Sequence, residues 1–262
     1  MGKYSLWLLN ALIEQIKFDY VIPKYKTEVV FDTILSIFIE EIINGKYYGQ
    51  NGESDKIKLI GKEFPIRIAT INSNWENEEY DTSINPDYLL ASNNTLYIVE
   101  LKTSSNSYDE ENQLANYIKV KSLIESQKSA NFIVSDFIRI GKIGNSKEFG
   151  LLKRENKKYQ LYYQTIKTLI EELNYLKNIS RVKIVYIVPS ALADKIAEQV
   201  EDVSILESLE GQFDNLVCTI TLSELSNISL ESYVNDEDII KSWKAVGELF
   251  EYIDGLDEHL EG

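Results

Sequence analysis

The chain has 262 residues, 44% of them hydrophobic and 26% charged, which is ordinary for one large folded domain or a core with an extension. One cysteine and one histidine exclude an internal disulfide and argue against a zinc site or a Cys-His or Ser-His nucleophile, and they favour a reducing, cytoplasmic setting. The formal net charge of -15 argues against a uniformly basic nucleic-acid-binding surface, and no apolar run reaches the roughly 18 residues that a membrane span needs.

Two helices are expected first, over 4–18 and 26–44. Two strands follow over 57–60 and 64–68, and then a polar, acidic loop over 72–83. In the second helix, Phe31, Leu35 and Phe38 recur at helical spacing and predict a core-facing stripe. Glu28 lies in the first turn of this helix, where the helix dipole favours an acid.

A β-hairpin is predicted over residues 87–102, because two strand-like runs flank the turn signal Asn93-Asn94. Glu100 and Lys102 are two residues apart on the second strand, so both side chains leave the same face. The hairpin can bring Asp87 near that face from the partner strand. Two carboxylates and a lysine are then sufficient to hold a hard divalent cation and to activate a water beside it. The alternative is a surface hairpin with three solvated charges.

A helix is predicted over about 109–127, with acids in its first turn and apolar residues at helical intervals. Gln113 and Tyr117 stand four residues apart and share one face of this helix. Two interpretations of that face stay open: a polar element beside the hairpin, or an ordinary amphipathic helix with Tyr117 in the core.

The remaining elements are expected to alternate strand and helix and predict an α/β fold in which helices flank a mixed sheet. Strands are expected at 132–134, 137–140, 181–189 and 216–220. Helices are expected at 159–176, 191–201 and 236–260.

The charge changes sign along this half of the chain. Residues 114–190 hold 14 basic and six acidic side chains, whereas residues 191–262 hold three basic and 18 acidic ones. We therefore expect a core over 1–190 and an acidic α/β extension over 191–262 that packs on it. The basic stretch 114–190 is a candidate for phosphate contacts, although lysines that simply face solvent would give the same count.

Taken together, Pro86-Asp87, Glu100-x-Lys102 and Gln113-x-x-x-Tyr117 resemble the PD-(D/E)xK nuclease superfamily, and the last element resembles its exonuclease-like branches. The resemblance implies a restriction-endonuclease-like fold, a mixed central sheet flanked by helices, with a helical insertion before the strand at 181–189. The charge count adds the acidic C-terminal region.

The same resemblance assigns roles to individual residues. Asp87 and Glu100 would bind Mg²⁺, for which Mn²⁺ would substitute, with the Leu101 carbonyl as a third ligand. Lys102 would position the attacking water, and Gln113 would face the metal or the scissile phosphate. Glu28 would reach the metal through water, unless it only complements the helix dipole.

The expected function is metal-dependent hydrolysis of phosphodiester bonds. DNA is the expected substrate by the resemblance, and the residues leave RNA open. The alternative is a catalytically inactive protein of the same fold, in which the acidic region 191–262 binds a basic protein or mimics nucleic acid. No membrane partner is expected.

Overall fold

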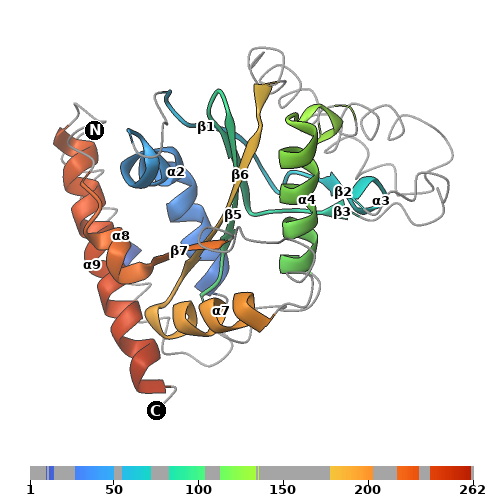
Figure 1. Cartoon of the computed structure of the whole chain (residues 1–262). Coiled ribbons are helices and arrows are strands. Elements are labelled where there is room, and N and C mark those ends of the chain that lie inside the picture. The colour runs from blue at the N-terminus through green and yellow to red at the C-terminus, as the bar shows by residue number, and fades with distance from the viewer. Residues whose placement is uncertain are drawn as a thin grey trace, which may run out of the picture. The chain divides into compact units, whose positions relative to one another are not determined.

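A computed structural model describes ten parts of the chain, shown as coloured elements in Figure 1 and comprising residues 10, 12–14, 27–49, 55–71, 83–103, 113–133, 135, 178–202, 217–229 and 237–260. The main sheet is mixed and five-stranded, in the order β1-β4-β5-β6-β7. Its strands are β1 (Lys58–Lys62), β4 (Tyr88–Ala91), β5 (Thr95–Leu101), β6 (Arg181–Val188) and β7 (Val217–Thr221). The described chain is thus an α/β protein with a mixed sheet, as the sequence predicts.

Contacts group the chain into two units, the first comprising residues 1–57, 100–108 and 185–262, and the second 58–99 and 109–184. The predicted division at residue 190 stays a prediction. Strand β7 belongs to the main sheet, so the acidic region after residue 190 contributes a strand to it.

The first unit contains helices α2, α7, α8 and α9, with bounds Thr27–Tyr47, Ser190–Asp202, Leu222–Ser226 and Glu237–Leu260. The predicted stripe on α2 is confirmed, since Phe31 and Leu35 are fully buried and Phe38 is 6% exposed. Aromatic rings join this stripe to α9: the centroids of Phe31 and Phe250 are 5.5 Å apart, and those of Phe38 and Trp243 are 5.1 Å apart. Large rings buried in this way dominate the packing energy of a core.

The second unit contains β1, β4, residues 95–99 of β5 and helix α4, together with three short elements, β2 (Ile66–Arg67), α3 (Ile68–Ile71) and β3 (Ser83–Ile84). Strands β2 and β3 pair in a separate antiparallel ribbon. Helix α4 (Gln113–Gln127) buries an apolar face that includes the predicted Leu114, Tyr117 and Ile118.

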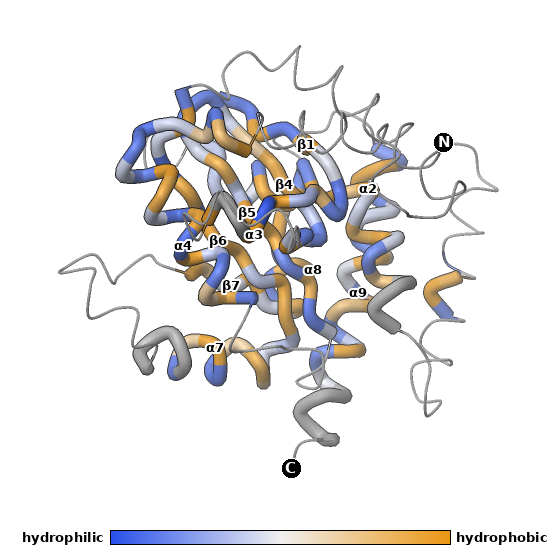
Figure 2. Tube along the Cα trace, turned by 90° about the vertical axis from the view of Figure 1, so that its right-hand side faces the viewer, coloured by the Kyte–Doolittle hydropathy of each residue, from blue (hydrophilic) through white to orange (hydrophobic). Residues whose placement is uncertain are grey.

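The predicted hairpin is confirmed, with β4 and β5 antiparallel and Tyr88 opposite Val99 at one end of the ladder. Every residue of both strands is buried, which is the pattern of strands covered on both faces. The turn is tied to β6, because the Asn94 carbonyl accepts hydrogen bonds from the N–H groups of Ser180 and Arg181 at 3.0 and 3.1 Å. In the hydropathy colouring of Figure 2 the central strands are largely orange, whereas α7 alternates between orange and blue.

One predicted strand is wrong, since residues 131–133 are helical. Helix α4 ends at Gln127, and Lys128 follows with a φ of 53°, in the left-handed region that terminates helices. The Ser129 hydroxyl then accepts the N–H of Asn131 at 3.2 Å and starts a new helical turn. This local capping outweighs the strand preference of the sequence Phe-Ile-Val.

The other strands and helices agree with prediction to within a few residues where the structure describes them, except that β3, α3 and α8 were not predicted. The predicted strand 137–140 and helix 159–176 lie outside the described residues, as does most of the helix 4–18 and of the loop 72–83. Within the described parts of the chain, no helix is long and apolar enough to cross a membrane.

Candidate functional site

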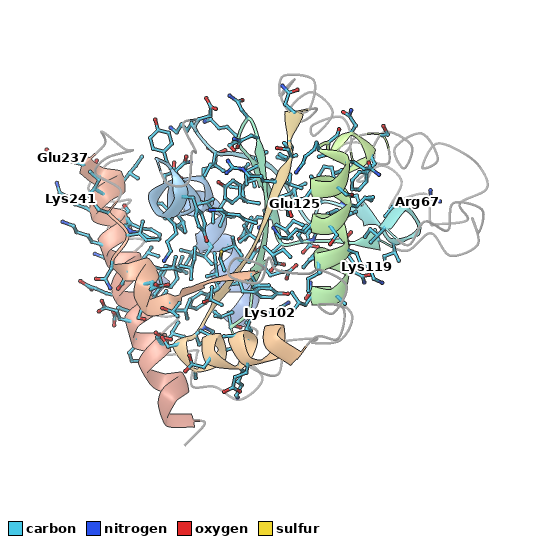
Figure 3. The ribbon with its side chains drawn as sticks, in the orientation of Figure 1. Arg67, Lys102, Lys119, Glu125, Glu237 and Lys241 are labelled. Carbon is cyan, nitrogen blue, oxygen red and sulfur yellow. The ribbon has the colours of Figure 1, made fainter. Side chains whose placement is uncertain are left out.

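Glu100 and Lys102 form an ion pair at the end of β5. The Lys102 Nζ lies 3.2 Å from the Glu100 Oε2, which agrees with the expectation that both side chains leave one face of the strand. The Glu100 side chain is 1% exposed and that of Lys102 is 9% exposed. Lys102 is labelled in Figure 3.

The burial of this pair makes it a candidate for function. Removing two charges from water costs several kcal/mol per ion, at order of magnitude, and their attraction in the interior often does no more than offset that cost. An apolar pair of the same size would serve the core at least as well. The pair is therefore weak as a stability device, and ionisable groups held out of water in this way are frequent at functional sites.

The main chain at Lys102 is fixed by the neighbouring strand. Its N–H donates to the carbonyl of Ile187 in β6 at 2.9 Å. Thr103, the next residue, is also buried, at 6% exposure. The main chain of Lys102 is therefore fixed, and only the torsions of its own side chain lie between this fixed backbone and the ammonium group.

Asp87 is half-buried and lies immediately before Tyr88, the first residue of β4. Its carbonyl accepts the N–H of Glu63 at 3.2 Å, and Glu63 has a φ of 49° in the left-handed region. The ladder pairs Tyr88 with Val99, so Asp87 and Glu100 are each the next residue beyond that pair. That these two carboxylates share a cation stays a prediction.

Gln113 and Tyr117 are in direct contact in the second unit. Gln113 is the first residue of α4, and its Nε2 donates to the Tyr117 hydroxyl at 3.2 Å. Tyr117 is fully buried, as the core interpretation of this residue predicts. Its hydroxyl also accepts the hydrogen bond from the Gln113 amide and so fixes the position of that amide.

The other two predicted residues have clear positions in the chain. Leu101 is the last residue of β5 and is 1% exposed. Glu28 is the second residue of α2, and its side chain lies outside the described residues.

The donor atoms are of the kind that magnesium prefers, namely carboxylate and carbonyl oxygens. Among the described residues no group of three or more His, Cys, Asp or Glu side chains could hold a metal ion. The predicted set has two such side chains and one main-chain carbonyl. Mg²⁺ commonly keeps several waters and takes only one or two protein carboxylates, so the set fits this ion in number and in chemistry.

Five of the 14 basic residues of the stretch 114–190 are described, namely Lys119, Lys121, Lys128, Arg181 and Lys183. The Lys121 ammonium lies 2.7 Å from the Glu125 Oε1 and 2.8 Å from the Val182 carbonyl oxygen. The same Glu125 oxygen accepts the Val182 N–H at 3.1 Å. Lys121 is therefore engaged in joining α4 to β6, and it is a poor candidate for a phosphate contact. The other nine basic residues of the stretch, which include Lys142, Lys147, Lys153, Arg154, Lys157 and Lys158, lie outside the described residues.

Sequence reasoning missed one buried carboxylate. Asp254 on α9 is 5% exposed and accepts hydrogen bonds from Ser190 and Ser223. A signal was present, because Asp254 continues the helical spacing of Trp243 and Phe250 and so falls on the buried face of the terminal helix. An acid in such a stripe calls for buried donors.

A scan of the chain against protein-family models found no match, and neither did searches of curated proteins and of solved structures.

Proposed function

We propose that this protein is a metal-dependent nuclease that hydrolyses phosphodiester bonds, with DNA as the expected substrate. The observation that carries the proposal is the buried Glu100–Lys102 pair at 3.2 Å, at the end of a strand paired with the strand that Asp87 precedes. A carboxylate for a cation and an ammonium group for a developing negative charge are the two kinds of group that this chemistry needs.

In this proposal the Asp87 and Glu100 carboxylates and the Leu101 carbonyl hold Mg²⁺. The ion, when bound, supplies positive charge to the scissile phosphate and lowers the pKa of a coordinated water. A lysine has three donors, so Lys102 can bond to Glu100 and still donate to the attacking water. Gln113, whose amide is held by Tyr117, offers its remaining polar atoms to the phosphate backbone.

The test is cleavage of supercoiled, linear and single-stranded DNA and of RNA, with Mg²⁺, with Mn²⁺ and with a chelator. We expect metal-dependent cutting by the wild-type protein. Glu100→Gln and Lys102→Met should each lower the rate at least about 100-fold, the scale seen when a group that stabilises transition-state charge is removed. Lys244→Met, which removes an exposed lysine on α9, is the matched control and should cut normally.

Wild-type protein that is inert on every substrate, and that gives no heat of Mg²⁺ or Mn²⁺ binding in calorimetry, would refute the proposal and favour the inactive acidic module. Helix α9 carries seven acids and two lysines, and one of the lysines, Lys241, lies 3.4 Å from Glu237 (both labelled in Figure 3).

A further inference from the structure

The Asp254 carboxylate joins the N-terminal ends of two helices. Its Oδ1 accepts the main-chain N–H of Ser190 at 2.6 Å, and its Oδ2 accepts the Ser190 hydroxyl at 2.6 Å and the main-chain N–H of Ser223 at 3.1 Å. Ser190 is the first residue of α7, and Ser223 is the second residue of α8. Each carboxylate oxygen thus accepts a main-chain N–H that has no partner within its own helix.

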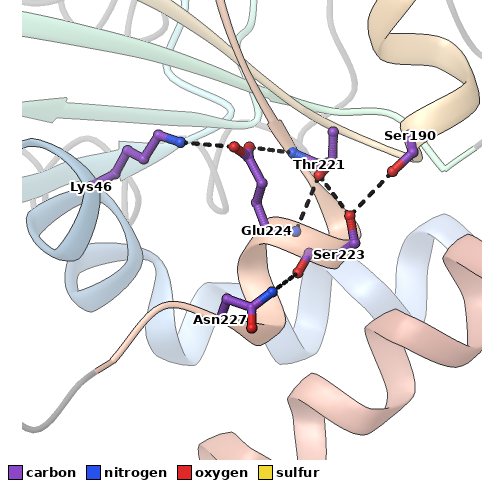
Figure 4. A network of polar contacts seen from close by, with 6 residues as sticks. All are labelled: Lys46, Ser190, Thr221, Ser223, Glu224 and Asn227. Atoms are coloured by element: carbon purple, nitrogen blue, oxygen red, sulfur yellow. Dashed lines mark hydrogen bonds and ion pairs between the residues drawn. The ribbon is translucent and has the colours of Figure 1, made fainter.

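Hydroxyl contacts extend this network through the first unit, as Figure 4 shows. The Ser190 and Ser223 hydroxyls are 3.2 Å apart, and the Ser223 hydroxyl is 3.0 Å from that of Thr221. Thr221 and Glu224 form a reciprocal capping box at the start of α8, and the Lys46 ammonium of α2 lies 3.2 Å from the Glu224 carboxylate. The network therefore connects helices that are far apart in the sequence.

Ser190, a member of this network, lies three residues after the β6 residue that accepts the Lys102 main-chain hydrogen bond. Ile187, whose carbonyl accepts the Lys102 N–H at 2.9 Å, is followed by Val188, Pro189 and Ser190. Proline has a fixed φ, so the short link between the two hydrogen-bonded points has little freedom. A shift of the Ser190 main chain is therefore transmitted to the β6 end against which Lys102 is held.

We propose that Asp254 is a positioning residue for Lys102, and that α9 is part of the framework of the candidate site. Asp254 fixes Ser190, Ser190 fixes the end of β6, and the Ile187 carbonyl fixes the Lys102 main chain. The effect on catalysis rests on the proposed nuclease function, whereas the effect on the Lys102 backbone does not.

Asp254→Asn is the sharpest perturbation, because it preserves shape. The asparagine side chain has one acceptor oxygen and one NH₂ group. The NH₂ group therefore has to face the main-chain N–H of either Ser190 or Ser223, and two donors that face each other form no hydrogen bond. Loss of one hydrogen bond to a charged group corresponds to roughly a tenfold change in a local opening equilibrium. Trp243→Phe is the matched control on the same helix, because it loses a hydrogen bond to the Ile228 carbonyl outside the network.

The primary measurement is amide hydrogen exchange at Lys102, divided by exchange at Ser92, whose N–H closes the hairpin turn by donating to the Thr95 carbonyl at 2.9 Å. A general loss of stability raises both rates together, so the ratio isolates the positioning effect. We expect Asp254→Asn to raise the ratio about tenfold and Trp243→Phe to leave it unchanged.

The second measurement is metal-dependent cleavage, in which Asp254→Asn should lower kcat about tenfold and change KM less than about twofold. If Asp254→Asn does not fold, Ser190→Ala, which removes the hydroxyl contacts with Asp254 and Ser223 and keeps the main-chain bond to Asp254, should raise the exchange ratio about threefold. An unchanged ratio in a folded variant overturns the inference. Wild-type protein without nuclease activity overturns the proposed function alone, since the exchange ratio still decides whether Asp254 positions Lys102.

Discussion

The burial of the Glu100–Lys102 pair leads to a prediction about stability that does not depend on the reaction. Lys102→Met replaces the lysine by an apolar side chain of similar length and removes the ion pair of the 1%-exposed Glu100 carboxylate with this lysine. Breaking a buried pair from one side costs about 3–5 kcal/mol. At about 2–4 °C per kcal/mol for a chain of this size, the melting temperature should fall by roughly 6–20 °C.

The reverse substitution should cost less. Glu100→Gln removes the charge that is more deeply buried, and Lys102, at 9% side-chain exposure, can turn its ammonium group toward water on a flexible stem. The double variant Glu100→Gln/Lys102→Met carries no charge at either position of the pair. It should regain most of the stability lost by Lys102→Met and, under the proposed function, should still fail to cut nucleic acid.

The assay is a double-mutant cycle with urea unfolding of the wild-type protein, both single variants and the double variant. We expect a coupling free energy of at least about 2 kcal/mol, well above the range of about 0.2–1 kcal/mol for exposed pairs. A coupling below about 0.5 kcal/mol would refute the reasoning, because it would mean that water screens the two groups as on a surface.

Three other contacts give predictions of measurable size. Asn44→Ala should destabilise the protein by about 2–5 kcal/mol in urea unfolding, because the Asn44 amide bonds both the N–H and the carbonyl of buried Ile57, at 2.9 and 2.8 Å. Glu125→Gln should cost about 1 kcal/mol and speed amide exchange at Val182, since Glu125 holds that N–H at 3.1 Å while 24% of its side chain is exposed. Trp243→Phe should cost about 1 kcal/mol through the lost indole hydrogen bond of 2.9 Å, with no change in cleavage. Unfolding free energies equal to that of the wild-type protein would contradict the first and third of these predictions, and unchanged exchange at Val182 would contradict the second.

The hairpin was predictable because its signals are local. An Asn-Asn turn between two apolar runs sets the pairing, and a strand period of two then places Glu100 and Lys102 on one face. The Gln113–Tyr117 contact was predictable for the same reason, since residues four apart meet on any helix. Where the spacing along one element decides the contact, sequence reasoning succeeds.

The missed features depend on what lies opposite in space. The helix α8 did carry a local signal, the capping box of Thr221 and Glu224, but its five residues are too few to show a helical period. Asp254 accepts donors from residues 31 and 64 positions away in the sequence. Lys121 was counted with the basic stretch because a count of charge contains nothing about Val182, which holds its ammonium group.

The acidity of residues 191–262 therefore has to be weighed residue by residue. The segment includes β7, which is a strand of the main sheet, and Asp254, whose carboxylate is buried among donors rather than displayed to a partner. Lys241 offsets Glu237 on the exposed side of α9. A further candidate role for this segment is to shield the site until a partner removes it. Such a shield would be expected to pack its acids against the site and to leave the core intact without it. This segment instead supplies a strand and a buried network that lead toward Lys102, so its negative charge is better explained as the solvated side of a structural element than as an inhibitor of the site.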